Sequence, residues 1–331
     1  MASVVKELTM EFTFLGTSSG TPTKQRNLTG LALRGKSAKR WYLVDCGEGT
    51  QHQLLHTYFT IASLEAIFIT HVHGDHCYGL PGILGSAAMS GRTAPLVIVA
   101  PAEIQTLINA IIQTSRLWLD FELKFIDVAT LKEPLVFADF GVEPVTLSHR
   151  VPCYGYHFVE NNIEHSLNTA KLIEQGIAAG PIWGRIHKGE DITLDDGQVL
   201  HSKDFIITDR KPRVLTVGGD NDNPQLLANV SVKPNVVIHE ATYTADVAAK
   251  VGPGPQHSSA KIVAEYAQQA AIKHLILTHF SPRYAYARQA EPSIRDVESE
   301  AREYYKGELF LANDLDSFEI DKTGNLHKVQ G

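Results

Sequence analysis

The sequence contains little that marks a secreted or membrane-bound protein. Its 331 residues include only three cysteines, which are widely spaced and form no Cys-x-x-Cys pair. An odd, scattered set of cysteines argues against a disulfide framework and indicates a reducing compartment. No apolar run approaches the ~20 residues that cross a bilayer, and residues 1–11 lack the basic-apolar-small pattern of a signal peptide. We therefore expect a cytoplasmic protein with no membrane partner.

An excess of basic residues is also absent. Lysine and arginine total 30 against 37 aspartates and glutamates, so the net charge is −7 with neutral histidines. General nucleic-acid binders are usually basic over the binding face, so the composition argues against a general nucleic-acid-binding protein. A role with nucleic acid must then depend on a local patch or on bound metal ions. The hydrophobic content of 44% suffices for a large core.

Side chains of the metal-ligand type concentrate directly after the apolar run of residues 64–69. Three histidines and one aspartate follow within six positions, namely His71, His73, Asp75 and His76. The first two can reach one metal ion from a tight turn, and the last two can reach a second ion beside it. Nitrogen and carboxylate ligands without thiolate suit zinc, with manganese or iron as alternatives. The competing interpretation is a histidine-rich surface loop.

The same pattern recurs along the chain. Short apolar runs, which are typical of buried strands, repeatedly end in a residue that can bind metal or carry a proton. These residues are Asp45, His71, His149, Asp220, Glu240 and His279. Strand ends of open α/β sheets are where such folds place their sites. We therefore predict two β-rich halves whose strand ends converge on one metal-bearing edge, although each residue taken alone is more often structural.

The residue pattern changes over residues 160–204. Strand-like runs are missing there, glycines punctuate a polar stretch, and one helix is expected near residues 167–175. Four lysines and arginines stand against eight aspartates and glutamates in this range. Long insertions in compact domains are often functional lids or binding loops. We interpret this range as an inserted arm, with an ordinary surface insertion as the alternative.

The pattern His-x-His-x-Asp-His after an apolar strand resembles the metallo-β-lactamase superfamily, and further segments resemble the short-form ribonuclease Z family within it. The matching segments are Phe14-Leu15-Gly16-Thr17, Pro22, Arg26-Asn27, Asp45-Cys46-Gly47-Glu48-Gly49-Thr50-Gln51, Gly79-Leu80-Pro81-Gly82, Gly218-Gly219-Asp220, His239-Glu240-Ala241-Thr242, His257-Ser258-Ser259 and Thr278-His279. The histidine loop is specific only to the superfamily. The segments that begin at His239 and His257 are those that point to ribonuclease Z.

The resemblance implies an α/β fold, a four-layer αβ/βα sandwich with a protruding arm, formed as a single domain over residues 1–331. It implies two zinc ions between the sheets, with manganese or iron as alternatives. The first ion is held by His71, His73 and His149, the second by Asp75, His76 and His279, and Asp220 bridges the two. The resemblance also implies a homodimer, and a flexible arm over residues 160–204 that serves as an exosite for precursor tRNA.

The implied activity is removal of the 3′ trailer from precursor tRNA, which leaves a 3′-hydroxyl on the tRNA. In this hypothesis two metals lower the pKa of a bridging water, and the resulting hydroxide attacks phosphorus. Asp75 accepts or steers the proton of the nucleophile. His257 protonates the departing 3′-oxygen and is held in its tautomer by Glu240. The alternatives are a surface carboxylate for Glu240 and a loop histidine for His257.

Contacts to the substrate are expected from four further residues. Arg283 and Arg26 are candidate phosphate contacts, and Gly180 and Pro181 offer backbone contacts from the arm. Two other functions remain open. One is a small-molecule metallohydrolase of the same fold, acting on a thioester, a lactone or an aryl sulfate. The other is a metal-stabilised RNA-binding protein without catalytic activity.

Overall fold

The structure is a computed structural model that describes residues 9–35, 39–161, 163–208, 210–285 and 291–329. Its contacts divide the chain into two compact units. The first comprises the described residues of 1–159 and 213–331, and the second comprises Glu160–Pro212. In the described part of the chain, none of the helices combines the length and the apolar character needed to span a membrane.

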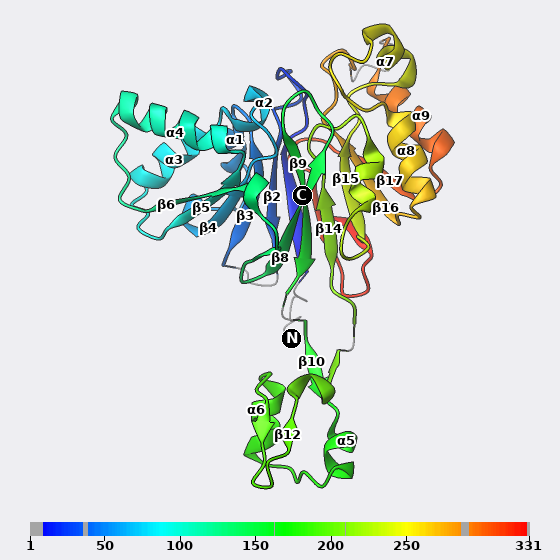
Figure 1. The fold of residues 1–331 in the computed structure, drawn as a ribbon. Coiled ribbons are helices and arrows are strands. Elements are labelled where there is room, and N and C mark those ends of the chain that lie inside the picture. The colour runs from blue at the N-terminus through cyan, green and yellow to red at the C-terminus, as the bar shows by residue number, and fades with distance from the viewer. Residues whose placement is uncertain (1–8, 36–38, 162, 209, 286–290, 330–331) are drawn as a thin grey trace, which may run out of the picture. The chain divides into compact units, whose positions relative to one another are not determined.

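The first unit is built on two large sheets (Figure 1). The eight-stranded sheet contains, in spatial order, β19 (Leu326–Val329), β18 (Ser317–Ile320), β1 (Met10–Gly16), β2 (Gly30–Arg34), β3 (Trp41–Cys46), β4 (Leu64–Phe68), β5 (Leu96–Ala100) and β6 (Leu123–Asp127). Strands β3 to β6 are mutually parallel, and the others pair antiparallel. The parallel part therefore delivers several chain segments to the same edge.

The second sheet repeats this arrangement. Its seven strands are, in spatial order, β17 (Glu308–Leu311), β16 (His274–Thr278), β15 (Val236–Glu240), β14 (Val214–Val217), β9 (Cys153–Glu160), β8 (Phe140–Leu147) and β7 (Leu135–Val136). Strands β14 to β17 are parallel. Every residue of β15 and β16 is buried, because parallel strands in such folds are covered on both faces.

The hydrophobic core lies in three layers, of which the central one joins the two sheets. Phe12 and Phe14 on β1 belong to this central cluster, whereas the adjacent Leu15 packs with the outer helices, since successive strand residues point to opposite faces. Phe68 from the first sheet meets Phe158 from the second with ring centroids 5.3 Å apart. Complete burial of such a side chain contributes about 1.5–3 kcal/mol. These contacts hold the two sheets face to face.

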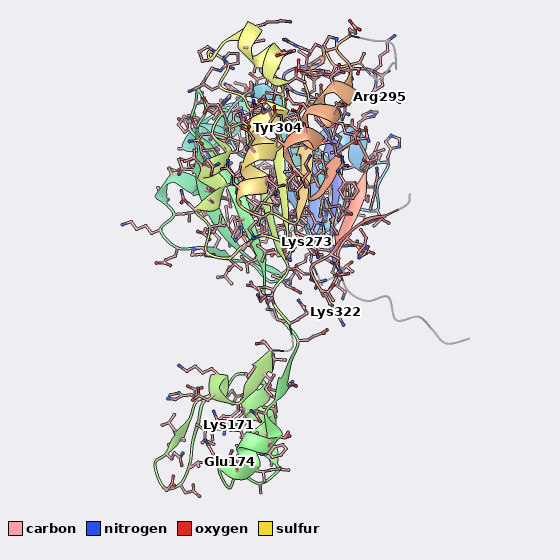
Figure 2. The ribbon with its side chains drawn as sticks, turned by 90° about the vertical axis from the view of Figure 1, so that its right-hand side faces the viewer. Lys171, Glu174, Lys273, Arg295, Tyr304 and Lys322 are labelled. Carbon is pink, nitrogen blue, oxygen red and sulfur yellow. The ribbon has the colours of Figure 1, made fainter. Side chains whose placement is uncertain are left out.

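Helices cover the outer faces of both sheets (Figure 1). They are α1 (Thr50–Leu54), α2 (Gly74–Cys77), α3 (Leu80–Met89) and α4 (Ala102–Ser115) beside the first sheet, and α7 (Ala245–Val251), α8 (Ala260–Gln269) and α9 (Ile294–Tyr304) beside the second. The connections of this unit also contain the short 3-10 helices η1 (Ile61–Ser63), η2 (Val128–Thr130) and η4 (Pro224–Ala228). Helix α8 begins after Ser259, whose hydroxyl accepts from the Ile262 amide. Arg295 and Tyr304 lie near opposite ends of α9 (Figure 2). The predicted four-layer αβ/βα arrangement is confirmed.

The second unit has its own small core and its own elements. They are β10 (His165–Leu167), α5 (Thr169–Glu174), α6 (Pro181–His187), β11 (Ile192–Thr193), β12 (Val199–Leu200), η3 (Ser202–Asp204) and β13 (Ile206–Thr208). Lys171 and Glu174 both lie on α5 (Figure 2). The expectation that strands are missing here was wrong, because β10 pairs with β13 and β11 with β12. Strands of two or three residues are too short to produce a recognisable alternation.

Candidate metal centre

Seven ligand-type side chains meet where loops leave the strands of both sheets. His71 and His73 follow β4, His149 follows β8, Asp220 follows β14, and His279 follows β16. Asp75 and His76 lie on the short helix α2. The ligand atoms of two groups, one of four residues and one of three, lie within 4.8 Å of one another in each group. The structure therefore brings together all of the residues predicted as ligands.

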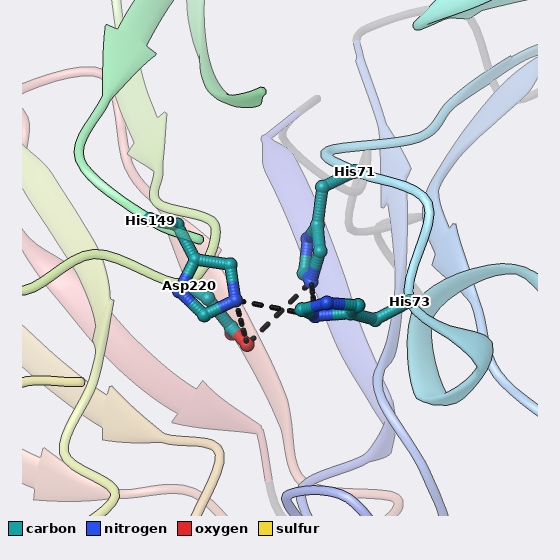
Figure 3. A group of neighbouring side chains, drawn as sticks. All are labelled: His71, His73, His149 and Asp220. Atoms are coloured by element: carbon teal, nitrogen blue, oxygen red, sulfur yellow. Dashed lines mark hydrogen bonds and ion pairs between the residues drawn. The ribbon is translucent and has the colours of Figure 1, made fainter. Parts of the chain in front are cut away.

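The first group contains three imidazoles and one carboxylate (Figure 3). The His73 Nδ1 atom lies 3.0 Å from His71 Nε2 and 3.2 Å from His149 Nε2. The Asp220 Oδ2 atom lies 3.6 Å from His71 Nε2 and 3.8 Å from His149 Nε2. Three nitrogens and one oxygen thus face a common point, as in tetrahedral zinc sites.

The second group uses the other oxygen of the same aspartate. Asp220 Oδ1 lies 3.4 Å from His76 Nε2 and 3.3 Å from His279 Nε2. The Asp75 Oδ2 atom lies 3.4 Å from His279 Nε2. Asp220 therefore presents one oxygen to each group, which is the arrangement required of a residue that bridges two ions.

In two of the histidines, the hydrogen bond made by Nδ1 shows which ring nitrogen carries the proton. The Nε2 atom of each ring then remains available to a metal ion. His76 Nδ1 lies 2.7 Å from Asp45 Oδ2, and His149 Nδ1 lies 3.0 Å from the Gln256 carbonyl oxygen. A carboxylate and a carbonyl only accept hydrogen bonds, so each Nδ1 carries the proton. The lone pairs on Nε2 then face the cluster. This donor set fits a metal ion, since ligating histidines usually donate their other N–H in this way.

The charges around the cluster also suit a cation. Burial opposes ionisation of Asp220, but the imidazoles of His279, His76 and His71 outweigh it and hold the pKa of that carboxyl well below its usual range. Burial likewise lowers the pKa of His71, which favours the neutral ring that a metal requires. Burial also opposes the charged form of His76, but the carboxylates of Asp220, Asp45 and Asp75 raise the pKa of that ring well above its usual value. The centre therefore presents an ionised Asp220 carboxylate among imidazoles whose pKa values are shifted in opposite directions.

A carboxylate–histidine pair borders the metal cluster. Glu240 is buried and its Oε1 atom lies 3.0 Å from His257 Nδ1. The His257 ring centroid is 5.2 Å from that of His149 and 5.5 Å from that of His279. Burial disfavours the charged ring, but the charge and hydrogen bond of Glu240 raise the pKa of His257 to about 9. Both residues lie where the sequence predicted an acid–base pair, although neither chemical role is tested by geometry alone.

The predicted substrate contacts have different surroundings. Arg283 is exposed, and its guanidinium lies 5.2 Å from the centroid of the Tyr243 ring. Arg26 is buried instead, donating to Thr17 Oγ1 and, at 2.7 Å, to the Ala312 carbonyl. The prediction that Arg26 contacts a substrate phosphate does not fit this burial, because the guanidinium is enclosed among protein acceptors.

The two arm residues lie in the second unit. Gly180 is the residue before α6, and Pro181 is its first residue. Both are exposed. The structure leaves their predicted contact with tRNA as a prediction.

Several positioning groups escaped the sequence reasoning. The Gly20 amide donates to Asp75 Oδ2 at 2.7 Å. Asn221 donates its backbone amide to Glu240 Oε1 at 2.9 Å and accepts from the Ser148 amide at 3.1 Å through its own side chain. The position directly after Asp220 is the only sequence signal that could have indicated Asn221.

The two sheets and their covering helices form the metallo-β-lactamase fold. The metallo-β-lactamase fold protein YhfI from Bacillus subtilis has a TM-score of 0.62 at 18% identity, with 94% of this chain and 99% of that chain covered. The human short-form tRNase Z has a TM-score of 0.60 at 23% identity, covering 93% of this chain and 98% of that one. A family model described as anti-Pycsar protein Apyc1 matches residues 10–170.

The relatives found by sequence indicate the family more specifically than the solved structures do. Ribonuclease Z from Marinobacter nauticus is 52% identical over 320 residues, which is 97% of this chain and 99% of the relative. Ribonuclease Z from Bacillus cereus strain ZK is 39% identical over 317 residues, or 95% of this chain and 100% of the relative. The chain belongs to the ribonuclease Z family. The predictions of this family and of a hydrolase are confirmed.

Proposed function

We propose that the chain is a zinc-dependent endoribonuclease that removes the 3′ trailer from precursor tRNA and leaves a 3′-hydroxyl on the tRNA. The observation that carries this proposal is the Glu240–His257 pair beside a ligand cluster with two halves. A metal cluster alone serves many hydrolases of this fold. A second proton-transfer group is needed where the leaving oxygen is a poor leaving group, as in RNA. The names of the relatives, ribonuclease Z and tRNase Z, support the same substrate.

The two groups of ligands would hold two zinc ions, with Asp220 contributing one oxygen to each. When bound, such ions activate a water molecule and neutralise charge on the phosphoryl oxygens. Manganese or iron would suit the same nitrogen and oxygen donors. The proposal is two ions per chain, which elemental analysis of the purified protein tests independently of activity.

Asp75 is proposed to orient the attacking water and to receive its proton. Its Oδ2 atom faces His279 Nε2 at 3.4 Å and is held from outside by the Gly20 amide at 2.7 Å. The loop that contains Gly20 is anchored in turn by Arg26, which donates to Thr17. Arg26 therefore supports the position of Asp75 from inside the protein, rather than binding the substrate itself.

His257 is proposed to protonate the oxygen that leaves phosphorus. Glu240 binds Nδ1, so Nε2 is the nitrogen available to a substrate. As water adds to phosphorus, the bond between phosphorus and the 3′-oxygen breaks and that oxygen takes the proton from His257. The tRNA keeps a 3′-hydroxyl and the trailer keeps the phosphate. Glu240 stabilises the charged ring before transfer and fixes its orientation.

Contacts remote from the cluster would position the RNA. Arg283 is the candidate phosphate contact of the first unit, since it is exposed. In the second unit, the backbone around Gly180 and Pro181 is proposed to contact tRNA. Pro181 has no backbone N–H, and the Trp183 amide donates to the Gly180 carbonyl oxygen at 3.0 Å, so the amides proposed to bind phosphate here are those of Gly180 and Ile182. The salt dependence of binding would report the number of phosphates contacted.

The test uses a precursor tRNA transcript that carries a 3′ trailer and a label at its 5′ end. The zinc-loaded protein should yield one labelled product that ends in a 3′-hydroxyl, and a chelator should abolish cleavage. A transcript of the same length with a scrambled tRNA fold is the substrate control. Absence of cleavage by protein shown to contain zinc would overturn the proposal, and hydrolysis of a thioester or lactone under the same conditions would identify the alternative.

A further inference from the structure

A cavity of about 350 Å³ lies directly beside the proposed proton donor. Its wall includes His257 together with Asp222, Tyr243 and Gln256. Ala248 and Ala249 of α7 add apolar lining to the cavity. This volume is at the lower end of the range of about 300–1,000 Å³ for small-molecule sites. It therefore has room for one flat ring system and not for a folded strand of RNA.

Three polar side chains of this wall have no hydrogen-bond partner among the described residues. They are the carboxylate of Asp222, the hydroxyl of Tyr243 and the side-chain amide of Gln256. The Asp222 backbone is fixed, because its amide donates to the Ser148 carbonyl at 3.1 Å. All three residues are half-buried, and a few polar groups with free hydrogen-bonding capacity around one small cavity are typical of a ligand site.

The Tyr243 ring is held in place from two sides. The Arg283 guanidinium lies 5.2 Å from its centroid, and the His257 ring meets it edge-on at 5.9 Å with an interplanar angle of 82°. A ring restrained in this way loses little freedom when a flat ligand stacks on it. Unpaired bases bind to proteins chiefly by stacking on aromatic side chains.

Gln256 connects this cavity to the metal cluster. Its φ angle is 54°, in the left-handed region that residues other than glycine seldom adopt. The same residue directs its carbonyl oxygen to His149 Nδ1 at 3.0 Å. Backbone strain of this kind persists where function requires it. One residue thus supports a proposed ligand on one side and lines the cavity on the other.

We propose that this cavity binds the base of the last nucleotide retained on the RNA, the one whose 3′-oxygen departs. The inference rests on the proposed function, because His257 serves that oxygen and lines the cavity. Tyr243 stacks on the base and Asp222 accepts from its exocyclic amino group. The exocyclic amino groups of adenine, cytosine and guanine carry two N–H bonds, whereas uracil offers a carboxylate only N3–H, which lies between two carbonyl oxygens that the carboxylate repels.

The test compares four precursor transcripts that differ only in this unpaired nucleotide. The zinc-loaded enzyme should cleave the adenine, cytosine and guanine forms with similar kcat/KM, and the uracil form about tenfold more slowly. Asp222→Asn should remove most of this difference, since an amide both donates and accepts. Tyr243→Leu should lower kcat/KM for all four transcripts about tenfold, and Tyr243→Phe should restore it. The zinc content of each variant should equal that of the wild type.

The matched control is Asp246→Asn, which replaces a carboxylate on α7 that does not line the cavity. It should keep the base preference of the wild type. If every transcript is cleaved equally by both the wild type and Asp222→Asn, the cavity assignment is overturned and the proposed function stands. If the zinc-loaded enzyme cleaves none of them, the proposed function fails and the cavity assignment fails with it.

Discussion

The Nε2 atom of His76 lies 3.2 Å from the Nε2 atom of His279, although 203 positions separate the two residues. The Nδ1 atom of His76 is bound to Asp45, and that of His279 lies 3.0 Å from Thr242 Oγ1. If the Nδ1 atom of each ring carries the proton, both Nε2 atoms have lone pairs that face each other, and these lone pairs repel. A metal ion or a proton between the two Nε2 atoms would remove this repulsion.

Removal of one ligand from each half should therefore lower metal content. His149→Ala and His279→Ala should each retain fewer zinc ions per chain than the wild type, and cleavage of precursor tRNA should fall by at least about 1,000-fold. Elemental analysis after gel filtration measures the first effect. His52→Ala, an exposed histidine on α1, is the control. Full zinc content in both ligand variants would contradict the assignment.

Asp45 should affect metal affinity without being a ligand. It accepts from His76 Nδ1 and, at 2.8 Å, from the Thr70 amide. Asp45→Asn should weaken zinc binding by about 10–100-fold, as for other outer partners of ligating histidines. Competition with a chelator of known affinity measures this change. The control is Glu65→Gln, which replaces a partly exposed carboxylate on β4 and should leave the zinc affinity unchanged.

The Glu240–His257 pair should separate chemistry from metal binding. His257→Ala and Glu240→Gln should both keep the zinc content of the wild type and lower kcat by about 10²–10⁴-fold. Single-turnover cleavage at saturating enzyme isolates this step. His56→Ala provides a surface comparison. Unchanged kcat in His257→Ala would remove the proton-donor role, and lost zinc would reassign it as a ligand.

His157, which is not one of the candidate metal ligands, should make the stability of the protein depend on pH. Burial lowers its pKa to about 4, and its Nδ1 atom lies 2.8 Å from Thr216 Oγ1. The unfolded chain, with a pKa near 6.5, binds the proton more readily, so stability is complete above pH 6.5 and is lost as pH falls toward 4. Between pH 7 and pH 5 this loss amounts to about 2 kcal/mol.

The measurement compares urea unfolding of the wild type and His157→Gln with chelator present throughout. Glutamine does not titrate, so the free energy of unfolding of the variant should fall by about 2 kcal/mol less between pH 7 and pH 5. All other titrating groups are common to both proteins. Equal losses in the two proteins would show that His157 is not kept neutral by burial.

Much of the centre could be predicted because the relevant signals are local. His71, His73, Asp75 and His76 are close in the chain, so their spacing alone indicates a shared site. The distant candidate ligand Asp220 was predicted from a weaker signal, the position of a polar residue at the end of an apolar run. That signal works because parallel strands deliver their ends to one edge.

The failures have an equally physical origin. Arg26 follows a glycine-rich loop, and nothing in its neighbourhood indicates that the guanidinium turns inward to Ala312, which is 286 positions away. The short strands of the second unit pair over two or three residues, which leaves no periodicity to read. Burial and pairing of this kind depend on which surfaces meet, and chain order does not specify that.

The sequence by itself indicated two β-rich halves, the kind of ligand and the strand ends that carry it, because strand periodicity and ligand chemistry are properties of neighbouring residues. The four-layer fold class was predicted from the resemblance to a known family. Only the tertiary structure decided that Asp220 presents one oxygen to each group of ligands. It also decided that Asp222, Tyr243 and Gln256 surround one cavity beside His257. Such arrangements arise from the packing of loops on two sheets, where distances of a few ångströms separate residues far apart in the chain.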